Sequence, residues 1–438
     1  MYNSIRHRFA TTILLESGEG PEFMARQSII CFDPIHVLEI ENRTLSIDGE
    51  LIAEGYDKIL TSLRGLIAKY QVATEKMFAG GLVGYVGFDF FELIENQKMK
   101  PSIDQFPTSI LGLFLDGIVY DHLNGEIHYF HHELLNSRLP AIKELLTKKV
   151  TNPKSDPQSI HINFSTSEQE FVKKVEQAKQ KISDGEVFQV VLSQKGKFKF
   201  SGAPSTLYEK LRKQNPSPYM YLLQFADLSI IGTSPELLIS EENGKLVTFP
   251  IAGTRKVYPD RAKMKRMERE LLSDPKELAE HNMLVDLARN DLGRVARIGS
   301  VKVTEYKQIQ RFSHVIHIVS KVEADLDTDK DMFDAFAAVF PAGTVSGAPK
   351  IRAIEIIDQL EKEPRGPYAG SVGYFGLGKN MVQAIAIRTA FGINEDFFIQ
   401  AGAGIVYDSS PELEYKETMN KLAIFTEVLQ GVDGVIRK

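Results

Sequence analysis

The chain has 438 residues, of which 43% are hydrophobic and 25% are charged, and its net charge is −6 at neutral pH. This composition is ordinary for a globular protein with a substantial core, and it excludes the basic footprint of a protein that binds nucleic acid or an anionic membrane. No apolar run reaches the roughly 18 residues needed to span a bilayer. With no secretory signal pattern and a single cysteine, Cys31, which excludes an internal disulfide framework, the sequence predicts a cytoplasmic protein.

The first 150 residues read mainly as short strands. The strands are expected in the runs "TILLES", "SIICFD", "VLEIE" and "IHYFHH", and one helix is expected over Tyr56–Tyr70. Residues 151–161 are polar and contain two prolines, which is typical of a linker. The sequence therefore divides into an N-terminal part, 1–150, and a C-terminal region, 160–438.

The C-terminal region mixes helices and strands without a fixed period. Ser167 followed by Glu170 predicts a capping box at the start of a helix. Strands are expected over 186–194, over 247–251 and over 382–390. The irregular alternation favours an α+β architecture with mixed or antiparallel sheets over a strict series of βαβ units.

Two predicted helices each carry a pair of glutamates three residues apart. The first pair is Glu277 and Glu280, the second is Glu414 and Glu417, and a proline opens each helix. Residues at this spacing are neighbours, with Cβ atoms about 5–6 Å apart, so each helix can present two carboxylates together. Two facing pairs would suit Mg²⁺. On spacing alone, solvated helix faces explain the pairs as well.

Other polar residues leave two interpretations open. Arg388 interrupts the apolar strand expected over 382–390, which is typical of a bidentate contact with a ligand carboxylate or of a structural ion pair. His317 lies alone in a predicted strand, where a structural role is more common than a catalytic one. The glycine-rich segment 340–360 lacks the spacing of a Walker A loop, so no nucleotide site is expected there.

Eight segments, in order across residues 165–430, resemble the chorismate-utilising enzyme family. They are "SPELLI", "PIAGTR", "KELAEHNMLVDLARNDLG", "GTVSGAPK", "GPYAGSVGYF", "IAIRTA", "QAGAGIVYDS" and "ETMNK". The N-terminal part matches more loosely, through "LLES", "SIICFDP" and "GGLVGYVGFD". The resemblance implies an α+β fold of two facing, largely antiparallel β-sheets with helices on the outside, in which both parts of the sequence interleave.

The resemblance also implies roles for individual residues. Glu280 and Glu417 correspond to the family's Mg²⁺ carboxylates, with Glu277 and Glu414 as neighbours that support them or reach the ion through water. Gly253, Thr254 and Gly404 correspond to positions beside the ring carboxylate of chorismate. Tyr368 and Arg388 correspond to positions that hold its enolpyruvyl carboxylate. The substrate-binding positions are therefore Gly253, Thr254, Tyr368, Arg388, Gly402 and Gly404. The residues expected at the catalytic centre are Gln189, Glu236, Thr254 and His317, of which Glu236 and His317 would flank the departing 4-hydroxyl group.

Two positions discriminate between branches of the family. Members that add water carry a lysine base in the strand that corresponds to "VFQVVLS", where this chain has Gln189, which cannot remove a proton. Members that deliver nitrogen to C4 use the lysine of Pro-Ile-Lys-Gly-Thr as a nucleophile, where this chain has Ala252. The resemblance therefore favours the large (component I) subunits of anthranilate synthases, which add ammonia at C2 of chorismate.

Partners and regulation follow from the same resemblance. Cys31 lies in a predicted strand without the sharp turn of a glutaminase nucleophile, so ammonia is expected from a separate glutamine amidotransferase subunit. The segments "LLES" and "NPSPYM" resemble two halves of a tryptophan feedback site. The expected tryptophan-binding residues are Glu16, Ser17, Pro218, Tyr219 and Met220. The alternative to a tryptophan site is that "LLES" is only the end of a strand and "NPSPYM" only a turn.

Two alternative functions stay open at this point. One is an aminodeoxychorismate synthase that lacks the usual lysine. The other is a non-catalytic tryptophan-sensing scaffold, which predicts losses among the metal and carboxylate-binding positions. The chain shows none of these losses.

Overall fold

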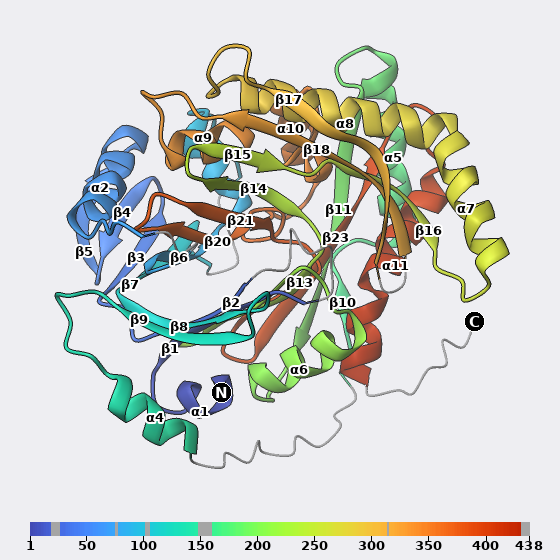
Figure 1. The fold of residues 1–438 in the computed structure, drawn as a ribbon. Helices are drawn as coiled ribbons and strands as arrows, with labels where there is room; N and C mark the ends of the chain where they lie inside the picture. Colours follow the sequence, from blue (N-terminus) through green and yellow to red (C-terminus); the bar gives the residue numbers. More distant parts are fainter. Residues whose placement is uncertain (19–26, 75–77, 101–105, 148–159, 313–314, 431–438) are drawn as a thin grey trace.

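Two antiparallel sheets face one another in the computed structural model, which describes residues 1–18, 27–74, 78–100, 106–147, 160–312 and 315–430 (Figure 1). The first sheet contains, in spatial order, β10 (Asn163–Phe164), β11 (Gln189–Lys199), β23 (Asp396–Ile405), β22 (Thr389–Ile393), β13 (Leu228–Ser234), β12 (Tyr219–Phe225), β1 (Thr11–Glu16), β2 (Gln27–Phe32), β8 (Asp116–Asp121) and β9 (Glu126–His131), and β19 (Gly347–Ala348) pairs with β11.

The second sheet is built in the same way. Its order is β16 (Ile251–Lys256), β18 (Val315–Asp325), β15 (Lys245–Thr248), β14 (Leu237–Glu242), β21 (Met381–Ile385), β20 (Ser371–Gly376), β6 (Gly81–Val86), β7 (Ser109–Phe114), β3 (His36–Glu41), β4 (Thr44–Ile47) and β5 (Glu50–Glu54), and β17 (Lys302–Arg311) pairs with β18.

Strands from both parts of the sequence share each sheet. β1 pairs with β12 in the first sheet, and β6 pairs with β20 in the second. This arrangement confirms the α+β fold of facing sheets that the family resemblance implied. Most of the linker expected over 151–161 lies outside the described residues.

Helices cover the outer faces of the sheets. They are α1 (Tyr2–Arg6), α2 (Tyr56–Lys69), α3 (Phe91–Ile94), α4 (Leu139–Thr147), α5 (Glu168–Ser183), α6 (Pro204–Gln214), α7 (Arg261–Ser273), α8 (Pro275–Gly293), α9 (Met332–Val339), α10 (Lys350–Leu360) and α11 (Pro411–Gln430), with 3₁₀ turns η1 (Phe88–Phe90) and η2 (Gly343–Val345). In Figure 1, α8 lies along β18, and α11 crosses the first sheet beside β23. None of the described helices is long and apolar enough to cross a membrane.

Both faces of the first sheet are buried, which explains why its strands read as continuous apolar runs. On β1, Ile13 belongs to the core between the sheets, whereas Leu14 belongs to the cluster under α6 and α11. Successive side chains of a strand point to opposite faces, so a strand covered on both sides needs apolar residues throughout. The predicted capping box is present, because the Ser167 and Glu170 side chains each bond the other residue's backbone N–H.

Three predicted strands have different limits in the structure. The strand expected over 247–251 is interrupted, because β15 ends at Thr248 and β16 begins at Ile251; Pro250 between them has no N–H for the ladder. The strand expected over 382–390 is also broken. β21 belongs to the second sheet and β22 to the first, so residues 386–388 carry the chain between sheets. The strand expected over 186–194 is β11 and begins only at Gln189.

Glycine at position 84 is required by the close pairing of β6 with β7. A Cβ at Gly84 would collide with the carbonyl oxygen of Ile110 on the neighbouring strand.

We expect Gly84→Ala to lower the free energy of unfolding by about 1–3 kcal/mol, because backbone must move to admit the methyl group. Gly65→Ala on α2 is the matched control, since nothing lies within 4 Å of that position. It should raise stability by about 0.5–1 kcal/mol. Urea unfolding of both variants measures the difference, and equal losses of stability would contradict the packing argument.

Candidate active site

Segments far apart in the sequence meet around the turn η2. This turn contacts α8, β19 and β23, and β19 pairs with the first residues of β11. The expected site residues lie on these elements, on α11, β16 and β18, and on the loops that precede β14, β20 and β22. The meeting point therefore joins the two sheets with the helices that carry the glutamate pairs.

Glu280 on α8 interacts with carboxylates from both helices. Burial raises the pKa of its carboxyl group, the negative charge of Glu277 raises it further, and Glu417 on α11 acts in the same direction. A long hydrogen bond opposes this rise, since Gln189 Nε2 donates to Glu280 Oε1 at 3.4 Å, and the charge of Lys276 acts in the same sense as that bond. The two glutamate pairs predicted on separate helices therefore lie within electrostatic range of each other.

The remaining glutamates of this group have their own partners. Arg255 Nη1 donates to Glu277 Oε1 at 2.9 Å, and Lys421 Nζ lies 2.8 Å from Glu417 Oε1. Burial raises the pKa of Glu414, whose side chain is almost completely enclosed. Glu277 and Glu417 are thus each paired with a cation. For Glu280 and Glu414, burial destabilises the charged form of the carboxyl group.

The acidic group could hold a hard cation through its carboxylate oxygens. In the described part of the chain, no three His, Cys, Asp or Glu side chains are already gathered as a metal site. Mg²⁺ typically takes only one or two protein carboxylates and fills its remaining positions with water and substrate oxygens. A cation would also offset the repulsion that Glu280 experiences from its neighbours. The donor chemistry therefore fits Mg²⁺.

Gly253 and Thr254 lie at an irregularity of β16, opposite His317 on β18. The register between these strands shifts between Ala252 and Thr254, and Gly253 has a φ of 66°, which favours glycine. His317 Nδ1 lies 2.8 Å from the Gly253 carbonyl oxygen. Because a carbonyl only accepts, Nδ1 carries the proton and Nε2 keeps its lone pair. Burial lowers the pKa of His317, so the ring is neutral at pH 7.

Arg388 is placed by the crossing of the chain from one sheet to the other. Its φ of 52° lies in the left-handed region, which explains why the strand expected there stops at this point. Burial lowers the pKa of the guanidinium, and the nearby Tyr368 opposes that effect. Among the described residues, no hydrogen bond or ion pair reaches the Arg388 guanidinium. A half-buried cation without a partner is costly, and an anionic ligand would stabilise it.

Tyr368 lies on the loop before β20, beside the same space. Its hydroxyl group accepts from the Gly402 backbone N–H, and burial raises its pKa well above the usual value, so the hydroxyl keeps its proton. A Cβ at Gly402 would lie 3.2 Å from the Tyr368 hydroxyl oxygen. A Cβ at Gly404 would lie 2.6 Å from Gln189 Nε2. Both glycines thus leave room for the polar groups around the space.

Glu236, just before β14, is an ionisable group whose pKa lies near neutrality. Burial raises the pKa of its carboxyl to about 7, while Thr344 and the charge of Lys421 oppose the rise. Thr344 Oγ1, on η2, donates to Glu236 Oε1 at 2.8 Å. Glu236 and Thr344 line a small cavity of about 50 Å³ together with Asp291. A carboxyl with this pKa can donate or accept a proton at pH 7.

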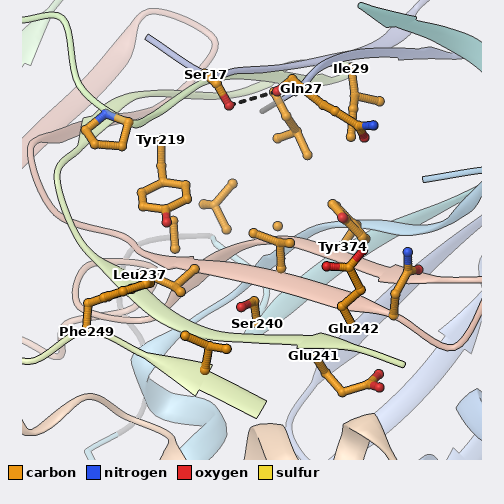
Figure 2. Close-up of a pocket in the computed structure, with 18 of the residues that line it drawn as sticks. Ser17, Gln27, Ile29, Tyr219, Leu237, Ser240, Glu241, Glu242, Phe249 and Tyr374 are labelled. Carbon is orange, nitrogen blue, oxygen red and sulfur yellow. Dashed lines mark hydrogen bonds between the residues drawn. The ribbon is translucent and has the colours of Figure 1, made fainter. Parts of the chain in front are cut away.

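A second, larger cavity lies between the sheets. Its volume is about 300 Å³, and all five residues of the expected tryptophan site line it, namely Glu16, Ser17, Pro218, Tyr219 and Met220. β1 and β12 pair with Glu16 opposite Met220, which brings the two segments together. Figure 2 shows Ser17 and Gln27 on one side of the cavity, Leu237 and Ser240 on the other, and the Tyr219 ring between them.

One residue of this second cavity also has partners on α6. The Glu16 carboxylate accepts two hydrogen bonds from Arg212 on α6, at 2.8 and 2.7 Å, and one from the Tyr208 hydroxyl. Its side chain is therefore committed to α6. The polar side chains of Ser17, Ser240, Glu242 and Asn380 are others that line the cavity and could meet an amino-acid head group.

Comparison with known proteins identifies the fold and the family. A family model described as chorismate binding enzyme matches residues 11–427. The chain is 43% identical to anthranilate synthase component 1 of Methanothermobacter thermautotrophicus, over 99% of this chain and 92% of that relative. It is similar to the crystal structure of anthranilate synthase component I from Streptococcus pneumoniae TIGR4, with a TM-score of 0.84, 38% identity and 92% coverage of each chain.

The chain belongs to the chorismate-binding enzyme family. The menaquinone-specific isochorismate synthase of Escherichia coli shares the fold, with a TM-score of 0.74 at 20% identity, over 98% of this chain and 91% of that one. Membership in the chorismate-binding enzyme family confirms the sequence resemblance. It makes the chain an enzyme of this class, with chorismate as the family's substrate.

Three residues at the site of this chorismate-binding enzyme were not singled out from the sequence. Thr344 bonds Glu236, and Lys421 Nζ donates to the Gly402 carbonyl oxygen at 2.8 Å while it pairs with Glu417. Arg255 bonds Glu277. The i,i+4 spacing of Glu417 and Lys421 was a signal for their pair. No sequence signal pointed to Thr344 or Arg255, because their partners are distant in the sequence.

The raised pKa of Glu236 predicts a measurable dependence of stability on pH. The folded state holds the proton to about pH 7, whereas an unfolded chain releases it near the usual pKa of about 4.3. Raising the pH through this window therefore favours unfolding, and Glu236→Gln removes the effect. From pH 4 to pH 8, we expect the wild type to lose on the order of 1–2 kcal/mol relative to this variant. Chemical unfolding at each pH tests this, and parallel curves would contradict it.

Proposed function

We propose that this chain is the large (component I) subunit of an anthranilate synthase. It converts chorismate and ammonia into anthranilate and pyruvate with Mg²⁺, the first step of tryptophan biosynthesis in the cytoplasm. The observation that carries the proposal is the half-buried, unpaired guanidinium of Arg388 beside Tyr368. It supplies an anion site in addition to the acidic group, and a substrate with two carboxylates requires two such sites.

The substrate carboxylates would bind at two places. Arg388 and the Tyr368 hydroxyl donate to the enolpyruvyl carboxylate. Gly253, Thr254 and Gly404 line the position of the ring carboxylate, which faces the glutamates of α8 and α11. Glu280 and Glu417 would hold Mg²⁺, and Glu277 and Glu414 would support them or reach the ion through water. The bound ion would supply positive charge beside the ring carboxylate.

The first stage adds ammonia at C2 and removes the 4-hydroxyl group. Glu236, protonated below about pH 7, would give its proton to the departing hydroxyl, which leaves as water. Gln189 cannot act as a base, and neutral ammonia needs none. Ala252 leaves room at C2 where a lysine would attack.

The second stage aromatises the ring. The C2 proton is removed and the enolpyruvyl group leaves as pyruvate. The aromatic ring that remains is anthranilate. His317 is the residue that we propose as the proton acceptor, because it is neutral and its Nε2 lone pair is available.

A separate glutamine amidotransferase subunit would supply the ammonia. Cys31 is fully enclosed, and burial raises the pKa of its thiol far above the usual value, which is the opposite of an activated nucleophile. Ammonia released into water at neutral pH would be protonated and lose its lone pair. Transfer from a docked partner avoids that loss.

The reaction is tested with the purified chain, chorismate, Mg²⁺ and an ammonium salt above pH 8, where more of the ammonia is neutral. We expect anthranilate, followed by its fluorescence, and we expect removal of Mg²⁺ by a chelator to abolish it. Aminodeoxychorismate in place of anthranilate would contradict the proposal, and so would the absence of any product, which a non-catalytic tryptophan-sensing scaffold would give.

Ala252→Lys is the specific variant for this reaction. We expect it to lower anthranilate formation at least 100-fold, because the amine fills the space beside C2. Ala53→Lys on β5, in the second sheet but away from the site, reports the effect of introducing a lysine elsewhere. Unchanged anthranilate formation by Ala252→Lys would show that position 252 does not face C2.

The 300 Å³ cavity supports a binding site for tryptophan, since its volume is at the lower end of the range for small-molecule pockets. The chain contains no tryptophan, so the ligand's own fluorescence reports binding. We expect saturable binding that inhibits anthranilate formation. Ser240→Leu, which fills the cavity, should weaken binding at least tenfold, whereas Ser46→Leu on β4 should not. Equal binding by the two variants would contradict this location.

A further inference from the structure

Arg365 is a buried arginine beside the site, and the proposed reaction does not use it directly. Its side chain is 2% exposed and donates four hydrogen bonds. Two go to the Glu361 carboxylate, at 3.0 and 2.8 Å. The other two go to backbone carbonyl oxygens, that of Val345 at 2.6 Å and that of Val191 at 2.8 Å. The guanidinium thus joins segments that are distant in the sequence.

Each segment that Arg365 contacts carries a group of the active site. Val345 follows Thr344, which donates to Glu236. Val191 belongs to β11, whose first residue is Gln189. The guanidinium also lies 5.7 Å from the centre of the Tyr368 ring, and the Tyr368 backbone N–H donates to the Arg365 carbonyl oxygen at 3.3 Å. One buried side chain therefore contacts the segments that carry Thr344, Gln189 and Tyr368.

The turn that carries Thr344 is held at two consecutive carbonyl groups. Arg365 binds the carbonyl oxygen of Val345, and the Val191 N–H donates to that of Ser346 at 2.9 Å. Since Arg365 also binds the Val191 carbonyl, it anchors both the turn and the strand that supports it. We propose that Arg365 is a positioning residue that holds the 343–346 turn so that Thr344 orients the Glu236 carboxyl group for proton transfer.

The geometry requires arginine at this position. A planar guanidinium can meet the Glu361 carboxylate with one edge and two carbonyl groups with the other, whereas a lysine ammonium cannot span this set. Glu361 is itself fixed, because its Oε1 accepts from the Ser193 backbone N–H at 2.7 Å and from the Ser193 hydroxyl at 2.8 Å. Lysine at 365 keeps the positive charge but releases the Val345 carbonyl.

The Thr344 hydrogen bond lowers the pKa of Glu236, so losing it should raise that pKa. The other charges near Glu236 are Lys421 on α11, and Asp291 on α8 with its partner Lys350 on α10 at 2.9 Å. All three residues are retained in every variant below. The expected change in reaction rate rests on the proposed role of Glu236 as the acid. The expected change in the titration of Glu236 does not depend on that role.

The experiment compares Arg365→Lys, Thr344→Val and the double variant in the full chain. We expect both single variants to lower kcat for anthranilate formation roughly 10- to 100-fold, because a misplaced acid transfers its proton poorly. Both should move the limb of the pH–rate profile near pH 7 to higher pH. The double variant should move it no further than Thr344→Val alone, because the two residues act through one hydrogen bond.

A second measurement does not need the reaction. With carbon-13 in the glutamate carboxyl groups, the Glu236 signal is assigned by its loss in Glu236→Gln and titrated without substrate. We expect its midpoint to rise in Arg365→Lys and in Thr344→Val. Arg352→Lys is the matched control, because Arg352 pairs with Glu186 at the surface of α10, and its titration should equal that of the wild type.

The outcomes separate positioning from simple stability. A lower melting temperature of Arg365→Lys with an unchanged Glu236 titration would overturn the inference and leave Arg365 a structural residue. Additive shifts in the double variant would also overturn it, since they require independent routes. If the chain makes no anthranilate, the proposed function fails, yet a Glu236 titration that depends on Arg365 would still support the positioning role.

Discussion

The antiparallel pairing of β11 with β23 is the constraint on which the site depends. Its register sets Val191 opposite Gly404 and Ser193 opposite Gly402, so the two glycines open the space that Gln189 and Tyr368 border. A shift by one residue would turn every side chain of either strand to the opposite face. α10 packs on β11, and α11 packs on β23, so the same pairing also positions the helices on either side. Errors in this ladder would therefore separate the carboxylates from the anion site.

Uncompensated charge is a second property of this site. Other buried ionic groups near the site are paired, as Arg365 with Glu361 and Lys350 with Asp291. At the site, Arg388 has no partner among the described residues, and Glu280 experiences repulsion from two carboxylates. Both arrangements cost stability in the absence of a ligand, and both become favourable when opposite charge binds. Natural sites often accept such a cost because preorganised charge lowers the energy of the transition state.

The facing sheets also explain why a second cavity exists. Strands from the N-terminal part supply Ser17 and Ile29 to its wall, whereas Leu237 and Phe249 come from the C-terminal region. Leu237 and Phe249 also border the small cavity next to Glu236. The two cavities therefore share a wall, and the interleaving of the chain places a potential ligand site one side chain away from the catalytic region.

Local physical chemistry is what the sequence by itself determined. The glutamate pairs, the capping box at Ser167 and the apolar runs of the buried strands depend on neighbours within a few residues, so their spacing was sufficient. The residue types at Ala252 and Gln189 likewise restrict the chemistry wherever the chain places them. Only the tertiary structure decided the rest. Arg388 lies at a crossing between sheets, and Thr344 meets Glu236 from more than a hundred positions away, because these contacts depend on the closure of both sheets and not on any local pattern.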